Sequence, residues 1–471
     1  MHKAILCMNQ PNILFIMTDQ QRADAMGCSG GWVKTPNLDR IASEGIFFPN
    51  AVTTSPVCIP ARVSLITGRY PHNTHIWHNC EHDMSPNTST WWQSIRDAGY
   101  RTSLFGKTHL HHHHGDLRDR EDLIQAYGMD DIDEIAGPRA SARCRTYMTE
   151  RWAEKGLWEK YQEDYAERFQ NKPWIARPSA LPLEEYADVY VGQQAKGYLQ
   201  NYNREEPWFC HVSFGGPHEP WDTPEPYASM YRPEDMPAPA GGGDSSDLSV
   251  VNGNLSRIRQ RAPENRSKED VAALRANYAG NVSLIDDQIG EILDVIEQRG
   301  ELDNTVIIFS SDHGEMNGDH GLIYKEHFLN GAVRVPLLVR TPETVHGEMA
   351  GTANYSPVEW IDIGPTLVET AGGELRHQQF GRSLCPVLED SITEHRSFAV
   401  SEISRELMIM DRQWKCVFNR NGEPYLLFDQ INDPEETVNR VDDPGLADLV
   451  HQMQDELFQR LVQTQVDKSR S

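Results

Sequence analysis

The sequence predicts an α/β protein with a large, mixed and mainly parallel sheet sandwiched by helices, followed by a small antiparallel sheet and a helix. Two observations predict the large sheet. Several apolar runs are continuous, which is typical of strands buried on both faces of a parallel sheet. Helical patterns stand between these runs, as they do in doubly wound folds. The expected strands are residues 13–17, 102–105, 208–214 and 306–309.

Each expected strand leads to a residue whose side chain can ligate a metal, carry charge or transfer a proton. In chain order these residues are Asp19, Lys107, His218 and Asp312. In open α/β sheets the ligand site lies beyond the carboxyl ends of the strands. We therefore expect the four side chains to meet at one crevice.

The clearest helix is expected over residues 269–299, where apolar side chains recur at helical spacing along one face. Gly300 ends this helix and a strand begins at Thr305, which is the helix-to-strand order of a doubly wound fold. Residues 232–268 are rich in Pro, Gly and small polar residues, so they predict a long surface excursion. Both a lid over the site and a plain insertion fit this composition.

The pattern changes after about residue 390, which predicts a catalytic domain over residues 1–390 and a C-terminal α+β subdomain over 391–471. Short strand-like runs follow, with Asn421-Gly422 as a hairpin signal. The expected strands are residues 397–400, 414–418 and 425–428, and the expected final helix is 446–462.

The composition excludes some classes of partner. A formal net charge of −26 argues against nucleic acid, because phosphate backbones are bound by clusters of Lys and Arg. No apolar stretch is long enough for a signal peptide or a membrane span, so we expect a cytoplasmic protein that does not associate with membranes. The eight cysteines are scattered singly, which predicts mostly free thiols, and only Cys58 has a neighbourhood that requires explanation.

Cys58 opens a C-x-P-x-R run at residues 58–62, and T-G-R-Y-P-H follows at residues 67–72. This pattern resembles the signature of the type I sulfatases, which are members of the alkaline phosphatase superfamily. Other segments resemble that family in the same order along nearly the whole chain. They are P-N-I-L-F-I-M-T-D at residues 11–19, T-P-N-L-D at 35–39, G-K-x-H-L at 106–110, P-H-x-P at 217–220, S-D-H-G-E at 311–315 and L-F-D-x-x-x-D-P-x-E at 427–436.

The resemblance implies an alkaline-phosphatase-like fold and the hydrolysis of sulfate monoesters. It also implies that a dedicated maturation enzyme oxidises Cys58 to formylglycine. The aldehyde hydrates to a geminal diol, and one hydroxyl, polarised by a cation, attacks sulfur. Deprotonation of the second hydroxyl then expels sulfate and restores the aldehyde. A serine at this position would form the sulfate ester but has no second hydroxyl whose deprotonation could expel sulfate.

The expected metal site combines residue chemistry with the resemblance. Asp19 and Asp312 supply the hard oxygen ligands that divalent cations prefer. The resemblance adds Gln20, His313 and the modified Cys58. Gln20 departs from the commoner Asp-Asp pair and removes one negative charge from the metal shell. Ca²⁺ is favoured, and the His and Gln ligands leave Mg²⁺ and Mn²⁺ open.

The resemblance also assigns roles around the ester. Lys107 and Lys325 are similar to the pair that binds the sulfate oxygens. Arg62 is similar to the residue that holds the formylglycine. His109 corresponds to the base that deprotonates the second hydroxyl, and His218 to the acid that protonates the leaving alcohol, roles that suit the pKa of imidazole.

The histidine run at residues 111–114 suggests zinc, but successive residues point in different directions and no Cys or carboxylate pattern accompanies it. We therefore expect a polar rim beside the substrate entrance. Polar residues soon after the signature are expected to line the pocket, and Asn79 is the expected substrate contact among them. The others are His75, His78 and His82.

Two alternatives stay open. A phosphonate monoester hydrolase or phosphodiesterase of the same superfamily also uses formylglycine, but the Lys107 and His109 pair favours sulfate esters. A non-catalytic binding protein would keep Cys58 as a thiol. The alcohol part of the substrate, carbohydrate or other small molecule, is not encoded in any motif; residues 110–180 and 222–268 are expected to select it. A homo-oligomer is compatible with the sequence, which carries no signal for it.

Overall fold

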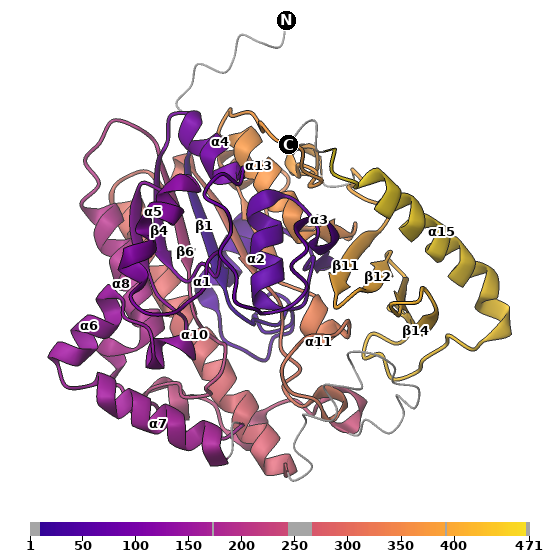
Figure 1. Cartoon of the computed structure of the whole chain (residues 1–471), viewed down its shortest axis with the longest axis horizontal. Helices are drawn as coiled ribbons and strands as arrows, with labels where there is room; N and C mark the ends of the chain where they lie inside the picture. Colours follow the sequence, from indigo (N-terminus) through magenta and orange to yellow (C-terminus); the bar gives the residue numbers. More distant parts are fainter. Residues whose placement is uncertain (1–9, 172–173, 244–265, 391–392, 468–471) are drawn as a thin grey trace, which may run out of the picture.

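A computed structural model describes residues 10–171, 174–243, 266–390 and 393–467. Its centre is an eight-stranded sheet with the strand order β5-β4-β6-β1-β7-β8-β2-β9 (Figure 1). The strands are β1 (Asn12–Thr18), β2 (Ile46–Phe47), β4 (Arg101–Gly106), β5 (Asp131–Glu134), β6 (Trp208–Ser213), β7 (Thr305–Ser311), β8 (Leu337–Arg340) and β9 (Thr352–Ala353).

The sheet is mixed and mainly parallel, as predicted. β1 lies between β6 and β7 and pairs with both in parallel register, and β4 and β5 continue the parallel order. Only β8 runs against its neighbours β7 and β2 among the described strands of this sheet. All four strands expected from the apolar runs form, and they are adjacent in space.

Burial on both faces explains why β1 is apolar throughout. Successive side chains of a strand point to opposite faces. Ile13, Phe15 and Met17 pack into the core on one face, and Leu14 and Ile16 pack into the core on the other. Both cores need an apolar residue at every position, so the run does not alternate.

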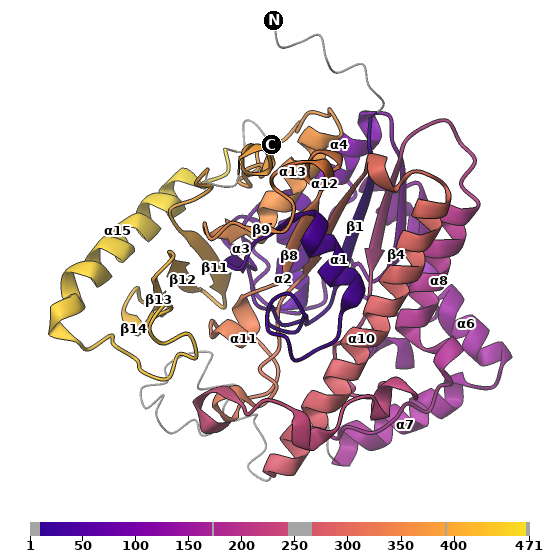
Figure 2. The same cartoon turned by 180° about the vertical axis from the view of Figure 1, so that it is seen from behind.

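Helices cover both faces of this sheet (Figures 1 and 2). One core receives side chains from α2 (Cys58–Thr67), α4 (Trp91–Asp97), α5 (Glu121–Ala126), α13 (Ile363–Thr370) and α14 (Cys385–Glu389). The other receives them from α1 (Pro36–Glu44), α6 (Tyr147–Glu154), α8 (Ala187–Gln200) and α10 (Lys268–Gln298). α7 (Trp158–Asn171) contacts α6 at the periphery. Short helices are α3 (Pro71–Thr74), α11 (Asn330–Val333) and α12 (Pro342–His346).

The long helix α10 begins and ends where the sequence predicts. Ser267 caps its first turn by accepting a hydrogen bond from the Asp270 backbone N–H, at 3.1 Å, and Gly300 follows its end with φ at 68°. The excursion before it is described only up to residue 243, in short 3₁₀ turns. Residues 244–265 lie outside the described residues, so the expected lid or insertion there stays a prediction.

A second sheet follows near the C-terminal end, with four antiparallel strands in chain order. They are β11 (Ala399–Ile403), β12 (Glu406–Met410), β13 (Trp414–Phe418) and β14 (Pro424–Asp429), and α15 (Ala447–Gln463) packs against them. The Asn421-Gly422 signal lies in the β13–β14 hairpin, with Gly422 at φ 81°. The sequence did not predict β12.

This small sheet shares a core with the preceding part of the chain, because Met408 and Phe428 pack with Val57 and Phe328. The domain boundary near residue 390 stays a prediction. The short strands β3 (Ala51–Val52) and β10 (Val358–Glu359) form a separate parallel pair. In the described part of the chain, no helix combines the length and apolar character that a membrane crossing requires.

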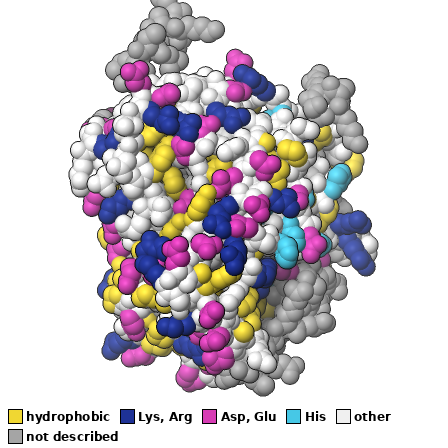
Figure 3. Space-filling view, turned by 60° about the vertical axis from the view of Figure 1, so that its left-hand side comes forward, with side chains coloured by type: hydrophobic (Ala, Val, Ile, Leu, Met, Phe, Trp, Pro, Cys, Tyr) yellow, Lys and Arg dark blue, Asp and Glu magenta, His cyan; other side chains and the backbone are white. Residues whose placement is uncertain are grey.

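Acidic and basic side chains are interspersed on the face shown in Figure 3. On this face the net charge of −26 is therefore not concentrated in one patch. The charge arrangement that matters for an anionic ester is the local one inside the site.

Candidate active site

The ends of four adjacent strands carry the predicted site residues. Asp19 directly follows β1, Asp312 follows β7 and Lys107 follows β4, while His218 lies a few residues beyond β6. All four side chains are buried. The expected convergence at the carboxyl end of the sheet is therefore what the structure has.

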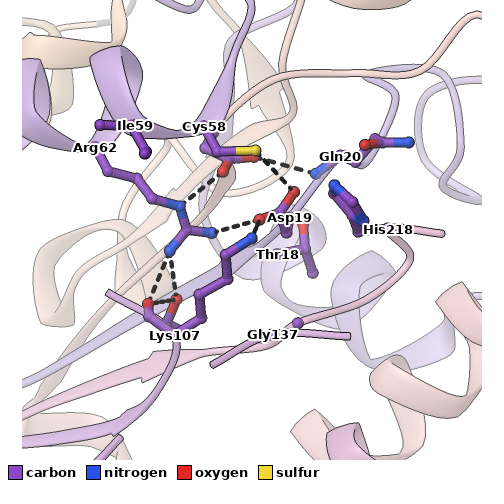
Figure 4. Close-up of polar contacts among 12 residues, drawn as sticks. Thr18, Asp19, Gln20, Cys58, Ile59, Arg62, Lys107, Gly137 and His218 are labelled. Carbon is purple, nitrogen blue, oxygen red and sulfur yellow. Dashed lines mark hydrogen bonds and ion pairs between the residues drawn. The ribbon is translucent and has the colours of Figure 1, made fainter. Parts of the chain in front are cut away.

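Cys58 reaches this point from the first turn of α2 (Figure 4). Its Sγ lies 3.0 Å from His313 Nε2 and 3.7 Å from Asp19 Oδ1. The Cys58 side chain is fully buried. Asp19, Cys58 and His313 therefore share one cluster, although 39 positions separate Asp19 from Cys58 and 255 separate Cys58 from His313. The order of the strands alone does not reveal this cluster.

Arg62 holds the carboxylates that surround Cys58. It lies one helical turn after Cys58 on α2, so both side chains face the strand ends. Its Nε donates to Asp312 Oδ2 at 2.7 Å and its Nη2 donates to Asp19 Oδ2 at 3.1 Å. Its Nη1 donates to the Lys107 backbone carbonyl at 2.8 Å. These contacts orient two carboxylates at once, which suits a planar guanidinium.

Charge in the cluster is balanced locally. Burial and the Cys58 thiolate would raise the pKa of Asp19, but nearby cations, Lys107 first, outweigh them and lower it. Burial raises the pKa of Asp312, and the neighbouring Asp19 charge adds to that effect. Burial would lower the pKa of His313, but Asp312 and Cys58 raise it to about 9. The pKa values of the two neighbouring carboxylates are therefore shifted in opposite directions, as expected when two like charges lie close together.

The cluster is chemically suited to a divalent metal. Its ligand atoms lie within 4.8 Å of one another and belong to Asp19, Cys58, Asp312 and His313. The other ring nitrogen of His313, Nδ1, lies 3.0 Å from the Gly314 carbonyl oxygen. That contact fixes Nδ1 as the donor and leaves Nε2 free to ligate, an arrangement that metal-binding histidines share.

Gln20 stands beside the cluster with its side chain turned to a second group of residues (Figure 4). Its Nε2 donates to Glu219 at 2.9 Å and to Glu315 at 2.5 Å, and its Oε1 accepts from Lys325 Nζ. Its backbone N–H donates to Asp312 Oδ1 at 3.1 Å. The amide therefore connects the predicted metal residues to Lys325.

Lys325 and His218 form the far side of the site. Lys325 Nζ lies 2.8 Å from His218 Nε2 and 3.9 Å from Glu219. Burial would lower the pKa of Lys325, but Glu219 and Cys58 raise it. Burial would raise the pKa of Glu219, but the charges of nearby cations, Arg139 first, lower it to about 2.

Glu219 and Arg139 are functional candidates that the sequence reasoning missed. Glu219 lies inside the P-H-x-P segment, at the position that the pattern leaves variable, so that segment was the available signal. Arg139 pairs with Glu219 and its guanidinium lies 4.7 Å from the Phe169 ring centroid. No sequence pattern singles out Arg139.

A cavity of about 510 Å³ opens above Cys58. Lys107, His109, His218 and Lys325 line it, and so does Asn79, whose Oδ1 accepts a hydrogen bond from the Ile59 N–H at 2.9 Å. The described lining residues do not include three of the expected ones, His75, His78 and His82.

His109 lies in the cavity in a conformation that only tertiary contacts maintain. Its φ is 57°, in the left-handed region, and Gln20 has φ 73°. Such residues cost on the order of 1–3 kcal/mol each and are common at functional sites. Burial lowers the pKa of His109 well below its usual value, and the Lys107 charge adds to that effect. The imidazole that faces Cys58 is therefore neutral, and one of its ring nitrogens carries a free lone pair.

Glycines at the strand end allow Lys107 to take its place. Gly106 has φ 116°, and a Cβ there would lie 1.9 Å from the Ser213 carbonyl oxygen of β6. Gly137, with φ 78°, packs against the Lys107 side chain (Figure 4). The glycine of the G-K-x-H-L segment is thus required by the close approach of two strands.

One of the two reasons for discounting the histidine run, the lack of an accompanying carboxylate, is wrong. A carboxylate does accompany it, because Glu134 at the end of β5 contacts both His111 and His113. The segment after β4 bends so that the rings of His111 and His113 both contact this carboxylate. His111, His112 and His113 do line the cavity, as the expected rim.

The mainly parallel sheet, the position of Cys58 on α2 and the cluster of potential metal ligands at the strand ends are those of a hydrolase of the alkaline phosphatase superfamily. Residues 11–373 match the Sulfatase family, and residues 318–463 match the family N-sulphoglucosamine sulphohydrolase, C-terminal. The chain belongs to the sulfatase family, and it is a sulfuric ester hydrolase.

Individual relatives cover almost the whole chain. An arylsulfatase of Clostridium perfringens is 28% identical over 92% of this chain and 90% of its own. The multifunctional alkaline phosphatase superfamily protein PehA of Trinickia caryophylli is 30% identical over 94% and 93%. The crystal structure of a phosphonate monoester hydrolase of Agrobacterium radiobacter has a TM-score of 0.78 and 27% identity, covering 97% of this chain and 96% of its own.

Proposed function

We propose that this sulfatase hydrolyses a sulfate monoester with a formylglycine nucleophile made from Cys58. The observation that supports this most is the position of Cys58. Its Sγ lies 3.0 Å from His313 and 3.7 Å from Asp19, at the bottom of a cavity lined by Lys107 and Lys325.

The cation belongs to this proposal. Asp19, Asp312, His313, the modified Cys58 and Gln20 are its proposed ligands, and Ca²⁺ is the favoured ion, with Mg²⁺ and Mn²⁺ as alternatives. A bound cation would stabilise negative charge that develops around sulfur. The amide of Gln20 contacts Lys325 here, so ligation would require it to exchange that contact.

The side chains around the cavity take separate tasks. Lys107 and Lys325 bind the sulfate oxygens and offset the charge of the transferring group. His109, neutral and facing Cys58, accepts a proton from the nucleophile residue. His218 gives a proton to the leaving alcohol. Arg62 keeps Asp19 and Asp312 in place, through the contacts of 3.1 and 2.7 Å.

The formylglycine is tested by peptide mass. Protein produced with a formylglycine-generating maturation enzyme should lose roughly eighteen daltons at the Cys58 peptide, because a thiol becomes an aldehyde. A Cys58→Ala variant is the matched control and should keep its mass and its fold. An active protein whose Cys58 peptide is entirely unmodified would overturn the proposal. An unmodified and inactive protein would favour the binding-protein alternative.

A phosphonate monoester hydrolase is the second candidate, favoured by the likeness to the Agrobacterium radiobacter enzyme. The Lys107 and His109 pair in the cavity supports sulfate over it. The test compares kcat/KM for an aryl sulfate with a matched phosphodiester and phosphonate monoester. We expect the sulfate to be preferred, with measurable turnover of phosphorus esters of the same geometry. A large preference for either phosphorus ester would reverse the assignment.

The alcohol part of the substrate is proposed to be selected by residues 110–180 and 222–268. A panel of aryl, alkyl, choline and carbohydrate sulfates on matured protein identifies it. The maturation enzyme is the proposed macromolecular partner, and a homo-oligomer is tested by light scattering.

A further inference from the structure

A second group of potential metal ligands lies beside the active site and is built from three residues that the reaction does not use. His111 and His113 come from the segment after β4, and Glu134 is the last residue of the neighbouring strand β5. Their ligand atoms lie within 4.8 Å of one another. The three residues are 1%, 4% and 5% exposed, so they are withdrawn from bulk water.

The geometry brings both rings to the same carboxylate. His111 Nε2 lies 2.7 Å from Glu134 Oε2, and His113 Nε2 lies 3.3 Å from Glu134 Oε1. The Thr108 hydroxyl donates to Oε1 as well, which orients the carboxylate. Ligating carboxylates are commonly held by such an outer hydrogen bond.

The remaining ring nitrogens face backbone carbonyls. His113 Nδ1 lies 3.1 Å from the Ala136 oxygen, and His111 Nδ1 lies 3.3 Å from the His112 oxygen. A neutral imidazole has one N–H, and carbonyl and carboxylate oxygens only accept. With Nδ1 donating to the carbonyl, each Nε2 presents a lone pair to a carboxylate oxygen. On both histidines a neutral ring can therefore donate to only one of its two oxygen contacts, either the carbonyl or the carboxylate.

A cation among the two Nε2 atoms and the carboxylate satisfies every group at once. We propose that His111, His113 and Glu134 bind a divalent cation of the zinc class. Two imidazoles and one carboxylate are a typical zinc ligand set, and Nδ1 bonded to a backbone carbonyl is the usual arrangement of a ligating histidine. His313 makes the same type of contact, at 3.0 Å from the Gly314 oxygen.

The site shares no ligand with the cluster around Cys58. The two are connected through His109, whose ring centroid lies 4.6 Å from that of His113. His111 and His113 also line the substrate cavity. A fourth coordination position is therefore directed to the cavity, where water or an oxygen of the alcohol part of the substrate fills it.

Metal stoichiometry tests the site without using activity. The full-length chain, produced without a histidine tag, is stripped with a chelator and titrated with Co²⁺ and Zn²⁺. We expect a second equivalent with the visible absorption of Co²⁺ held by nitrogen and oxygen ligands. His113→Gln and Glu134→Gln should weaken this second equivalent by at least about 100-fold, because loss of even an outer partner of a metal ligand costs roughly 10–100-fold.

His114→Gln is the matched control. His114 belongs to the same run, but it is exposed and lies outside the ligand group, so the second equivalent should be unchanged. Asp312→Asn should weaken the other equivalent alone. Thermal unfolding of each stripped variant checks that the fold is kept. One equivalent in the wild type, or a second equivalent that survives both His113→Gln and Glu134→Gln, would overturn the proposal and leave a charged His111–Glu134 pair.

Discussion

His218 is expected to determine how the rate depends on the leaving group. Its Nδ1 lies 2.8 Å from the Glu219 carbonyl oxygen, so Nδ1 donates there and only Nε2 is available to an ester oxygen. General acid catalysis contributes about 10²–10⁴-fold. Lys325 lies 2.8 Å from the same Nε2 and keeps its charge when the imidazole is removed. We therefore expect His218→Ala to cost about 100-fold, near the lower end of that range.

A loss of that size is about 2.7 kcal/mol of transition-state stabilisation. It should appear in kcat/KM for an unactivated alkyl sulfate, whose alkoxide needs a proton to leave. An activated aryl sulfate leaves without one, so its kcat/KM should fall by less than about threefold. The measurement uses a series of aryl sulfates whose leaving phenols differ in acidity, assayed with wild type and variant. The kcat/KM of the variant should depend more steeply on the pKa of the leaving phenol.

Lys325→Ala is the comparison variant, because Lys325 is proposed to bind sulfate oxygens and not the leaving group. It should slow activated and unactivated esters alike. If His218→Ala slowed both classes equally, the assignment of His218 as the acid would be refuted. An equal slowing with unchanged thermal unfolding would indicate instead that His218 only positions Lys325.

The remaining predictions concern the nucleophile and the fold. Cys58→Ser should keep the fold and lose multiple turnover, which burst kinetics with an aryl sulfate measures. Gly106→Ala should destabilise the protein by more than Gly99→Ala in urea unfolding, because both have positive φ but only the Gly106 Cβ would meet a backbone atom, at 1.9 Å. Gly99→Ala should cost about 1–2 kcal/mol. Asp362→Asn should cost about 3 kcal/mol, since it removes the nearer of the two carboxylates that pair with the buried Arg396 and leaves only Glu359, at 3.5 Å. Burial would raise the pKa of Asp362, but Arg396 lowers it. This carboxylate therefore stabilises the fold above about pH 4 and progressively less as the pH falls, so the variant should flatten the acid side of the stability profile.

Local patterns in the sequence were sufficient for four adjacent strands of the large sheet, β4, β6, β1 and β7. The run at residues 13–17 is apolar at every position because helices cover both faces of the sheet. This burial leaves a continuous apolar pattern that can be recognised in the sequence. The same holds for α10, whose apolar face and flanking Ser267 and Gly300 are local features. The convergence of Asp19, Lys107 and Asp312 could be predicted because the ligand site of an open α/β sheet lies beyond the carboxyl ends of its strands.

Short elements were harder to predict. β12 (Glu406–Met410) follows a two-residue turn of Ser404 and Arg405, both with positive φ, where the sequence has neither Gly nor Asn as a signal. β5 (Asp131–Glu134) consists of three acidic residues and one isoleucine, so no strand pattern exists. It forms because β4 offers a parallel partner at the sheet edge.

By itself the sequence determined the fold class, the family and the set of side chains at the strand ends, because periodicity, turn residues and motif spacing are properties of neighbouring residues. Only the tertiary structure decided which groups touch. Glu134 meets His111 and His113 across two strands, Gln20 turns toward Lys325, and Arg62 joins two carboxylates from different strands. Such contacts join residues that are distant along the chain, and their geometry depends on how strands and helices pack, which no local pattern specifies.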